Sequence, residues 1–141
     1  MARIIGIDIG ERRIGMAISD ESQTMARGIE AIDVKGKAEC VLKIKDIAEK
    51  FNACEAIVGL PLNMNGSKGP QAKKAIVFIN SLKEKLSIPV TAFDERLTTK
   101  QGERILIEAD MSRKKRKTKI DSLAAQIMLQ SYLDSKTESR D

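Results

Sequence analysis

The sequence predicts an α/β fold, a mixed five-stranded sheet with helices on its faces, in a single domain. The first observation is length, because 141 residues match one domain at roughly 150 residues per domain. The second is a set of three short β-branched runs with tight links near the N-terminus, which predicts an antiparallel three-strand meander. The third is the later alternation of helical and strand-like segments, which predicts parallel strands beside that meander.

The first half of the chain supplies the meander and one helix. Apolar runs at residues 3–9, 14–19 and 26–34 predict three strands, and Gly10 ends the first of them. Apolar residues then recur at helical spacing, which predicts a helix over residues 37–51. The change of period after the third strand therefore marks the end of the meander.

The second half begins with a predicted strand over residues 55–60 and a polar loop over residues 61–67. Gly69 and Pro70 then open a helix, because proline lacks an N–H that the first helical turn would leave unbonded. Residues 88–93 form the fifth predicted strand, which ends at a cluster of charged residues.

Two more helices complete the predicted domain. Thr98 is a suitable N-cap for a helix that ends near residue 110, and a last helix ends near residue 133. We expect the domain to span residues 1–135 and residues 136–141 to form a polar C-terminal tail.

Composition excludes several classes of protein. Hydrophobic residues make up 42% of the chain, too many for a disordered protein, and no stretch approaches the roughly 20 apolar residues of a membrane span. The N-terminus lacks the features of a signal peptide. Cys40 and Cys54 are not in a CxxC motif and the chain has no His, which argues against a disulfide or a zinc site. We therefore expect a cytoplasmic protein with no membrane partner.

The positive charge of the chain is concentrated in one segment. Lys and Arg number 25 against 20 Asp and Glu, and six of those cations lie within residues 113–119, which leaves 19 cations against 20 acids elsewhere. These six are Arg113, Lys114, Lys115, Arg116, Lys117 and Lys119. Such a block indicates either an anionic partner or a solvated loop. Aromatic residues make up only 3%, so base stacking is not expected to be the main binding device.

Asp8 is the first candidate functional residue. Along its strand Ile7 and its alternate neighbours point to one face, whereas Gly6, Asp8 and Gly10 point to the other. A carboxylate in a buried strand is costly unless it is paired or coordinated, and we expect both glycines to clear space around it. The alternative is an Asp that caps a turn that the glycines serve. The two chemical uses of such a motif are binding a divalent metal and binding nucleotide phosphate, as in actin-like ATPases.

Further acids lie at the ends of other predicted elements. Asp94 and Glu95 follow the fifth strand, at the same end of the sheet as Asp8, and either could be a ligand. Asp121 opens the last helix, on the face that carries Ala124, Ala125 and Met128, although it also fits a capping box. Three convergent acids suit Mg²⁺ or Mn²⁺, and a divalent ion should then raise thermal stability.

Four segments in this order resemble the YqgF/RuvX family. They are residues 6–10 with 12–15, residues 59–67, residues 94–99 and residues 119–125. The resemblance implies a ribonuclease H-like fold and a nuclease, described either as a Holliday-junction resolvase or as a nuclease of 16S rRNA precursor maturation. It also implies a catalytic and metal-binding role for Asp8, Glu95 and Asp121. The chain departs from the pattern at Glu11, commonly Thr, and the fourth strand ends without the carboxylate of many ribonuclease H-like enzymes.

Cations and a loop near the predicted acids are candidates for binding nucleic acid. Arg12, Arg13 and Arg96 lie close to the acids in sequence, and the basic segment at residues 113–119 precedes Asp121. Backbone N–H groups around Asn65 and Ser67, before a helix N-terminus, could contact phosphate. Contacts of this kind predict recognition of shape rather than sequence.

The leading hypothesis is a metal-dependent endonuclease that acts on structured nucleic acid, preferably precursor 16S rRNA at its 5′ end. That preference rests on the resemblance. The alternatives are a resolvase of branched DNA, a non-catalytic nucleic-acid-binding module and an actin-like ATPase, although the chain has room for only one of the two ATPase lobes. Ribosomal particles are a possible partner, and both a monomer and a homodimer remain open.

Overall fold

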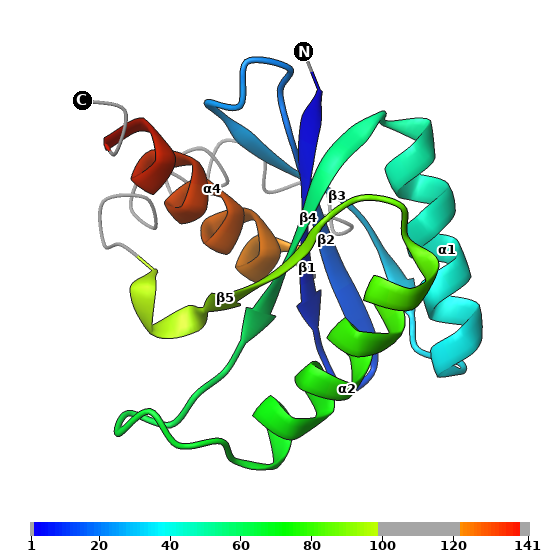
Figure 1. The fold of residues 1–141 in the computed structure, drawn as a ribbon, viewed down its shortest axis with the longest axis vertical. Coiled ribbons are helices and arrows are strands. Elements are labelled where there is room, and N and C mark those ends of the chain that lie inside the picture. The colour runs from blue at the N-terminus through cyan, green and yellow to red at the C-terminus, as the bar shows by residue number, and fades with distance from the viewer. Residues whose placement is uncertain (1, 99–121, 139–141) are drawn as a thin grey trace, which may run out of the picture.

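The computed structural model describes residues 2–98 and 122–138 (Figure 1). The predicted helix after Thr98, the basic segment at residues 113–119 and Asp121 lie outside the described residues. The elements in chain order are β1 (Arg3–Ile9), β2 (Arg13–Ser19), β3 (Ala26–Asp33), α1 (Lys37–Lys50), β4 (Ala53–Leu60), α2 (Pro70–Lys85), β5 (Val90–Asp94), the short 3₁₀ turn η1 (Glu95–Leu97) and α4 (Leu123–Glu138).

The strands form one mixed sheet in the order β3-β2-β1-β4-β5. β2 is antiparallel to both β1 and β3, whereas β4 is parallel to both β1 and β5. The predicted meander with parallel strands beside it is therefore confirmed. Because β1, β4 and β5 run in one direction, their C-terminal residues Ile9, Leu60 and Asp94 lie along one edge, here called the carboxyl edge.

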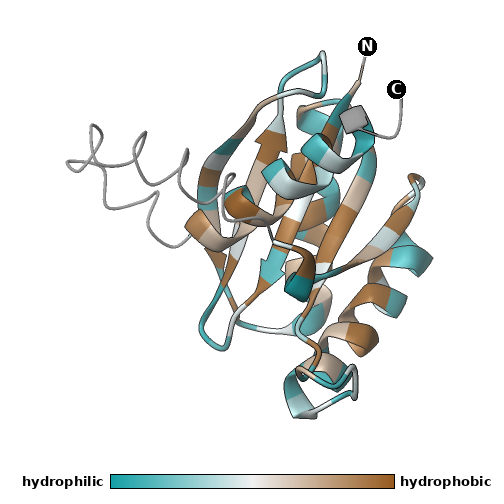
Figure 2. Cartoon of the chain, turned by 90° about the vertical axis from the view of Figure 1, so that its left-hand side faces the viewer, coloured by the Kyte–Doolittle hydropathy of each residue, from teal (hydrophilic) through white to brown (hydrophobic). Residues whose placement is uncertain are grey.

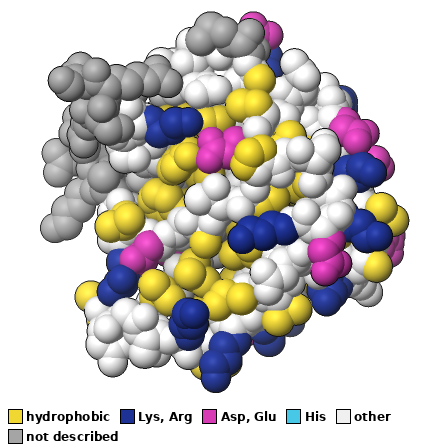
Figure 3. Space-filling view, viewed as in Figure 1, with side chains coloured by type: hydrophobic (Ala, Val, Ile, Leu, Met, Phe, Trp, Pro, Cys, Tyr) yellow, Lys and Arg dark blue, Asp and Glu magenta, His cyan; other side chains and the backbone are white. Residues whose placement is uncertain are grey.

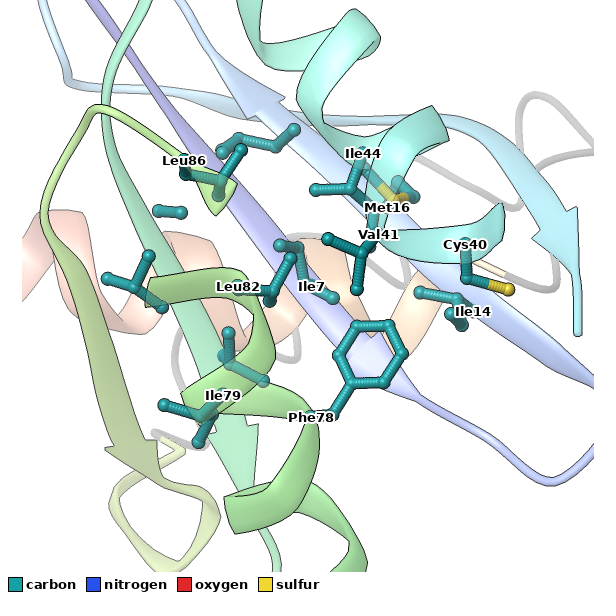
Figure 4. Close-up of a cluster of buried hydrophobic side chains, with 14 of the residues drawn as sticks. Ile7, Ile14, Met16, Cys40, Val41, Ile44, Phe78, Ile79, Leu82 and Leu86 are labelled. Carbon is teal, nitrogen blue, oxygen red and sulfur yellow. The ribbon is translucent and has the colours of Figure 1, made fainter. Parts of the chain in front are cut away.

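One face of the sheet is covered by α1 and α2 and is packed with hydrocarbon (Figure 4). The alternation along β1 places Ile5 and Ile7 on this face, and both are fully buried. Fully burying one such side chain contributes about 1.5–3 kcal/mol, so this face supplies much of the stability. Figure 2 shows the hydropathy of each residue. Apolar residues run along the strands, and the helices alternate between apolar and polar residues.

The other face is covered by α4, which crosses the sheet opposite α1 and α2 (Figure 1). Three glycines face this helix or the site beside it. A Cβ on Gly6 would lie 3.1 Å from Leu129 Cβ, and a Cβ on Gly28 would lie 3.3 Å from Ser122 Cβ. The third is Gly59, which lies beside Met128. The absence of side chains at these positions lets α4 approach the sheet closely.

Polar side chains, rather than apolar ones alone, attach α4 to the sheet. Ser122 Oγ accepts a hydrogen bond from the Met16 N–H (3.2 Å) and donates one to the Ile29 carbonyl oxygen (2.6 Å). This contact lies where the pairing of β2 with β3 shifts register, so the serine bonds two backbone groups at the irregularity. Gln126 donates a hydrogen bond to the Ala26 carbonyl oxygen of the edge strand β3.

Two expectations about this last helix were wrong. Ala124 was placed on its buried side, but Ala124 is exposed while Ser122 and Gln126 are buried. A pattern of apolar residues does not detect a helix that buries polar side chains against strand backbone. The helix also runs to Glu138 instead of ending near residue 133, so residues 136–138 are not part of a tail.

The last turns of α4 are attached to β4 through one carboxylate. Tyr132 donates a hydrogen bond to Glu55 Oε2 (2.7 Å), and Lys136 Nζ lies 3.5 Å from Glu55 Oε1. The second of these contacts attaches the helix to the sheet beyond residue 133. In the described part of the chain, no helix combines the length and the apolar character needed to cross a membrane.

Candidate functional site

Asp8 lies near the carboxyl edge on the face that α4 covers. It follows Gly6 by two residues and is partly buried. Its register partner on β2 is Gly15. On its other side Ile7 pairs with Val58 of β4, so Gly59 is the next residue beside Asp8. Asp8 therefore has a glycine on each neighbouring strand, which leaves lateral space around its carboxylate.

Gly6 and Gly10 lie two residues before and after Asp8, and each has a different role in the structure. Gly6 allows the close approach of α4 described above. Gly10 belongs to the turn between β1 and β2, where its N–H donates a hydrogen bond to the Arg13 carbonyl oxygen (3.0 Å). A Cβ on Gly10 would lie 2.5 Å from that oxygen. The expectation that both glycines clear space around Asp8 was thus wrong for Gly10, which serves the turn.

The side chain of Glu95 extends over β4 to reach Asp8. Glu95 begins η1, directly after β5, and β4 lies between β5 and β1. A Cβ on Gly59 would lie 2.6 Å from Glu95 Oε1 and 2.9 Å from Met128 Sδ. The Glu95 carboxyl group therefore occupies the space over β4 that a side chain at position 59 would fill.

The contact between the two acids changes the acidity of Glu95. Burial raises the pKa of Glu95 to about 7, and the charge of Asp8, a hydrogen bond with Asp8 and the charge of Asp94 act in the same direction. A hydrogen bond between two carboxyl groups requires a proton on one of them. Asp8 and Glu95, here called the acid pair, thus form a half-buried site where two carboxyl groups are brought close together.

The carboxylate of Asp94 forms an ion pair with Arg96. Its Oδ2 accepts a hydrogen bond from Arg96 Nη2 (2.7 Å), and its Oδ1 accepts one from the Arg96 backbone N–H (3.0 Å). The hydrogen bonds from Arg96 hold the pKa of Asp94 below its usual range. The two adjacent acids therefore differ in surroundings, and only Glu95 interacts with Asp8.

Arg96 also connects η1 to the loop at residues 61–69. Its Nη1 donates a hydrogen bond to the Met64 carbonyl oxygen (3.3 Å), and Gly66, at a positive φ of 86°, lies beside its guanidinium group. Arg96 was predicted to bind nucleic acid, and the structure shows it engaged within the protein on two sides.

The loop that was predicted to offer backbone N–H groups to phosphate uses two of them internally. The Ser67 N–H donates to Asn65 Oδ1 (3.0 Å), and the Gly66 N–H donates to the Asn63 carbonyl oxygen (2.8 Å). Asn63 Nδ2 donates to Ser67 Oγ (2.9 Å). The loop is therefore ordered by its own hydrogen bonds, and it lies at the carboxyl edge because it follows β4.

The predicted cationic residues are only partly within the described chain. Arg12 and Arg13 are exposed in and after the turn that follows β1, and Arg13 Nε lies 3.4 Å from Asp33 Oδ1. On the face seen in Figure 3, Lys and Arg side chains are dispersed among acidic and apolar ones. The six cations of residues 113–119 lie outside the described residues.

The acid pair suits a divalent cation, because Mg²⁺ and Mn²⁺ prefer carboxylate oxygens and would offset the repulsion between the two groups. Within residues 2–98 and 122–138, no group of three or more acidic or Cys side chains could hold a metal ion. Asp121, the third predicted acid, lies outside these ranges, although its neighbour Ser122 is bonded to β2 and β3.

Sequence reasoning missed three residues that shape this site. Gly15 and Gly59 give the acid pair its space, and Ser122 attaches the start of α4 to the sheet. Glycine inside otherwise β-branched strands was the available signal for the first two, since it often marks a close approach. No comparable signal exists for Ser122, because its partners are distant in sequence.

Relatives with assigned descriptions cover nearly the whole chain. A protein from Caldanaerobacter subterraneus subsp. tengcongensis is 55% identical over 138 residues, which are 97% of this chain and 99% of that protein. One from Syntrophomonas wolfei subsp. wolfei is 44% identical, over 99% of each chain. Both are described as candidate pre-16S rRNA nucleases.

Solved structures show the same fold at low identity. T. thermophilus RuvC in complex with a Holliday junction substrate aligns with a TM-score of 0.63 and 14% identity, over 97% of this chain and 98% of that chain. The fowlpox virus Holliday junction resolvase aligns with a TM-score of 0.57 and 18% identity, over 94% and 99%. The expected ribonuclease H-like fold is thereby confirmed. A family model described as RuvX, Holliday junction resolvase, matches residues 2–135, and the chain therefore belongs to the RuvX family.

Proposed function

We propose that this protein is a divalent-metal-dependent nuclease that hydrolyses phosphodiester bonds in structured RNA, in the cytoplasm, at the 5′ end of precursor 16S rRNA. The observation that carries the proposal is the acid pair at the carboxyl edge, where Asp8 and Glu95 meet over Gly59. Ligands bind at this edge in sheets of this kind, and clustered carboxylates are the ligands of Mg²⁺ and Mn²⁺.

Asp8, Glu95 and Asp121 are the proposed metal ligands. The chemistry that a divalent ion supplies between such acids is activation of the attacking water and stabilisation of the leaving oxygen. The assignment of Asp121 is supported by its place in the chain, directly before Ser122. Ser122 Oγ accepts a hydrogen bond from the Met16 N–H. Met16 follows Gly15, the register partner of Asp8.

The surrounding residues favour Glu95 over Asp94 as the second ligand. Arg96 holds the Asp94 carboxylate through several hydrogen bonds and offsets its charge. Within residues 2–98 and 122–138, Glu95 forms no ion pair, and burial and the neighbouring Asp8 favour its protonated form. A carboxyl group with a pKa near 7 loses its proton readily when a cation approaches.

Binding of the substrate is proposed to rest on cations that lie close to the proposed metal ligands in the sequence. Arg12, Arg13 and the six cations of residues 113–119 are the candidates, with Asn65, Ser67 and Arg96 contributing at the loop. Affinity from such phosphate contacts should fall steeply with salt and carry little sequence information. Binding to ribosomal particles would follow if the precursor is cleaved within them.

Cleavage of branched DNA is the second candidate, because the matching family model is described as a Holliday junction resolvase. Symmetric cleavage of a four-way junction favours a dimer, whereas trimming of an RNA end requires only a monomer. Precursor 16S rRNA and a four-way DNA junction, compared at equal salt and metal concentrations, distinguish the two. Preferred cleavage of the junction by a dimeric protein would reject the RNA proposal.

The test of the metal-dependent mechanism is a cleavage assay with Mg²⁺ or Mn²⁺ on the wild type and Asp8→Asn. We expect the variant to lose at least about a hundredfold in rate, equivalent to about 2.7 kcal/mol. The matched control is Asp46→Asn, the same chemical change at an exposed position of α1 on the opposite face. Equal rates for the wild type and Asp8→Asn would reject the proposal. A wild type that binds RNA without cleaving it would indicate a non-catalytic binding module.

A further inference from the structure

A hollow lies at the carboxyl edge, on the face opposite the acid pair. It has a volume of about 470 Å³ and lies between the turn after β1, the start of α1 and the first turns of α2. Figure 1 shows that turn between α2 and the start of α1. A volume of this size is within the range of pockets that bind small ligands.

The floor and walls of this hollow are apolar. Ile14 and Phe78 are buried at its base, and Val34 and Val77 remain 42% and 52% exposed beside it. Exposed apolar side chains around a concave surface are a feature of binding sites, because they gain by being covered. The lining therefore suits an apolar group.

The rim of the hollow is cationic. Its titratable groups are Lys37, Lys73, Lys74 and one acid, Glu11, which accepts a hydrogen bond from Gln71 (3.4 Å). Among the described residues, none forms an ion pair with these three lysines. α2 adds to this charge, since its first turn holds no acid and its N-terminus has no side-chain cap. A ligand that combines an apolar group with a negatively charged one would match both the apolar floor and the cationic rim.

We propose that this hollow binds one unpaired nucleotide of the RNA substrate, with the base on the apolar floor and a phosphate against the lysines. The inference rests on the proposed function and names the form of RNA that the protein recognises, a strand with an unpaired nucleotide near the cleaved bond. A base held in a double helix cannot enter the hollow, so the site selects single-stranded positions.

The position of the hollow along the chain supports this assignment. Its lining includes Ile9, Gly10 and Glu11, which directly follow Asp8. Because consecutive Cα atoms are about 3.8 Å apart, the Cα atoms of Asp8 and Glu11 lie at most roughly 11 Å from each other. A strand that crosses the carboxyl edge could therefore contact the acid pair on one face and place a neighbouring nucleotide in the hollow on the other.

The test measures binding of a short labelled single-stranded RNA and of its matched duplex in EDTA, so that no cleavage occurs. Val77→Trp fills the hollow without changing charge, and Val34→Trp does so from a different segment of the lining. We expect each to weaken binding of the single strand about tenfold and to leave duplex binding almost unchanged. Lys73→Glu with Lys74→Glu should reduce the dependence of log K on log salt by roughly 0.7 for each lysine.

Matched controls are available on the same helices. Leu42→Trp introduces the same side chain at a 54% exposed position of α1 away from the hollow. Lys83→Glu with Lys85→Glu makes the same charge change at the other end of α2. Both controls should bind the single strand like the wild type, and circular dichroism should show all variants folded.

Several outcomes would overturn the inference. Unchanged single-strand affinity in both tryptophan variants would do so, as would an equal loss for single strand and duplex. If Val77→Trp altered self-association in sedimentation instead of RNA affinity, the hollow would belong to an interface with a second copy. The proposed function fails separately, when Asp8→Asn cleaves like the wild type, so the two failures are distinguishable.

Discussion

The two faces of the sheet are packed with different sets of side chains. The face under α1 and α2 is hydrocarbon, with Ile7, Ile44 and Leu82 fully buried in one cluster. The face under α4 also has a buried apolar cluster, which includes Leu129 and Leu133, but it adds glycines, buried polar side chains such as Ser122, and the acid pair at its edge. Both faces contribute to stability, but only the face under α4 also positions the acid pair, so substitutions under α1 and α2 should change stability without changing activity.

The largest expected effect is on the hydrocarbon face. Leu82→Ala should cost about 2–5 kcal/mol, because Leu82 is fully buried and its removal leaves a cavity. That corresponds to a fall in Tm of roughly 10 °C, measured by thermal denaturation. Cleavage by the variant well below its Tm should equal that of the wild type. A large loss of cleavage in the folded variant would contradict the separation of the two faces.

Gly59→Ala should produce the opposite pattern. The added Cβ would lie 2.6 Å from Glu95 Oε1, so the carboxyl group must move away from Asp8. We expect cleavage and Mn²⁺ affinity to fall by about tenfold to a hundredfold with a much smaller change in Tm. The control is Gly36→Ala, where nothing lies within 4 Å of the new Cβ and φ is −175°. Wild-type activity in Gly59→Ala would show that Glu95 does not need this space.

Ser122→Ala tests how α4 is attached to the polar face. It leaves the Met16 N–H and the Ile29 carbonyl oxygen without their partner, at a cost of about 1–3 kcal/mol. Chemical denaturation measures this cost. Ser81→Ala is the control, since within the described part of the chain Ser81 donates a hydrogen bond only to the Val77 carbonyl oxygen of its own helix. Equal stabilities for the two variants would mean that the buried hydrogen bonds of Ser122 contribute little.

The smallest expected effect is the pH dependence of the metal-free protein. A raised pKa means that folded Glu95 keeps its proton between about pH 4.5 and pH 7, where the unfolded chain has lost it. Stability from this group is present below that window and is lost as the pH rises through it. We expect a fall in Tm of a few °C that Glu95→Gln removes.

Adding Mg²⁺ or Mn²⁺ tests whether the acid pair responsible for this pH dependence also binds a metal ion. A divalent ion that binds only the folded state raises stability according to its concentration relative to its Kd. We therefore expect the ion to raise the Tm of the wild type above pH 7 and to have little effect on Asp8→Asn. An equal rise in both proteins would place the ion elsewhere.

The positions of the strands and of the first helices could be predicted because apolar spacing reports which residues a strand or helix buries. The same rule failed for α4, where Ala124 is exposed while Ser122 and Gln126 are buried. Polar residues resemble surface residues in sequence unless their backbone partners are known. Gln126 bonds to Ala26, a hundred positions away, and no local window contains both.

Local pattern also marked Asp8 as unusual and placed Glu95 at the end of a strand, since a carboxylate in an apolar run is costly wherever the chain folds. It could not decide between Asp94 and Glu95. Only the folded sheet brings Glu95 across β4 to Asp8 while Arg96 retains Asp94. Periodicity is encoded in neighbouring residues, whereas the space over Gly59 exists only after three strands have paired.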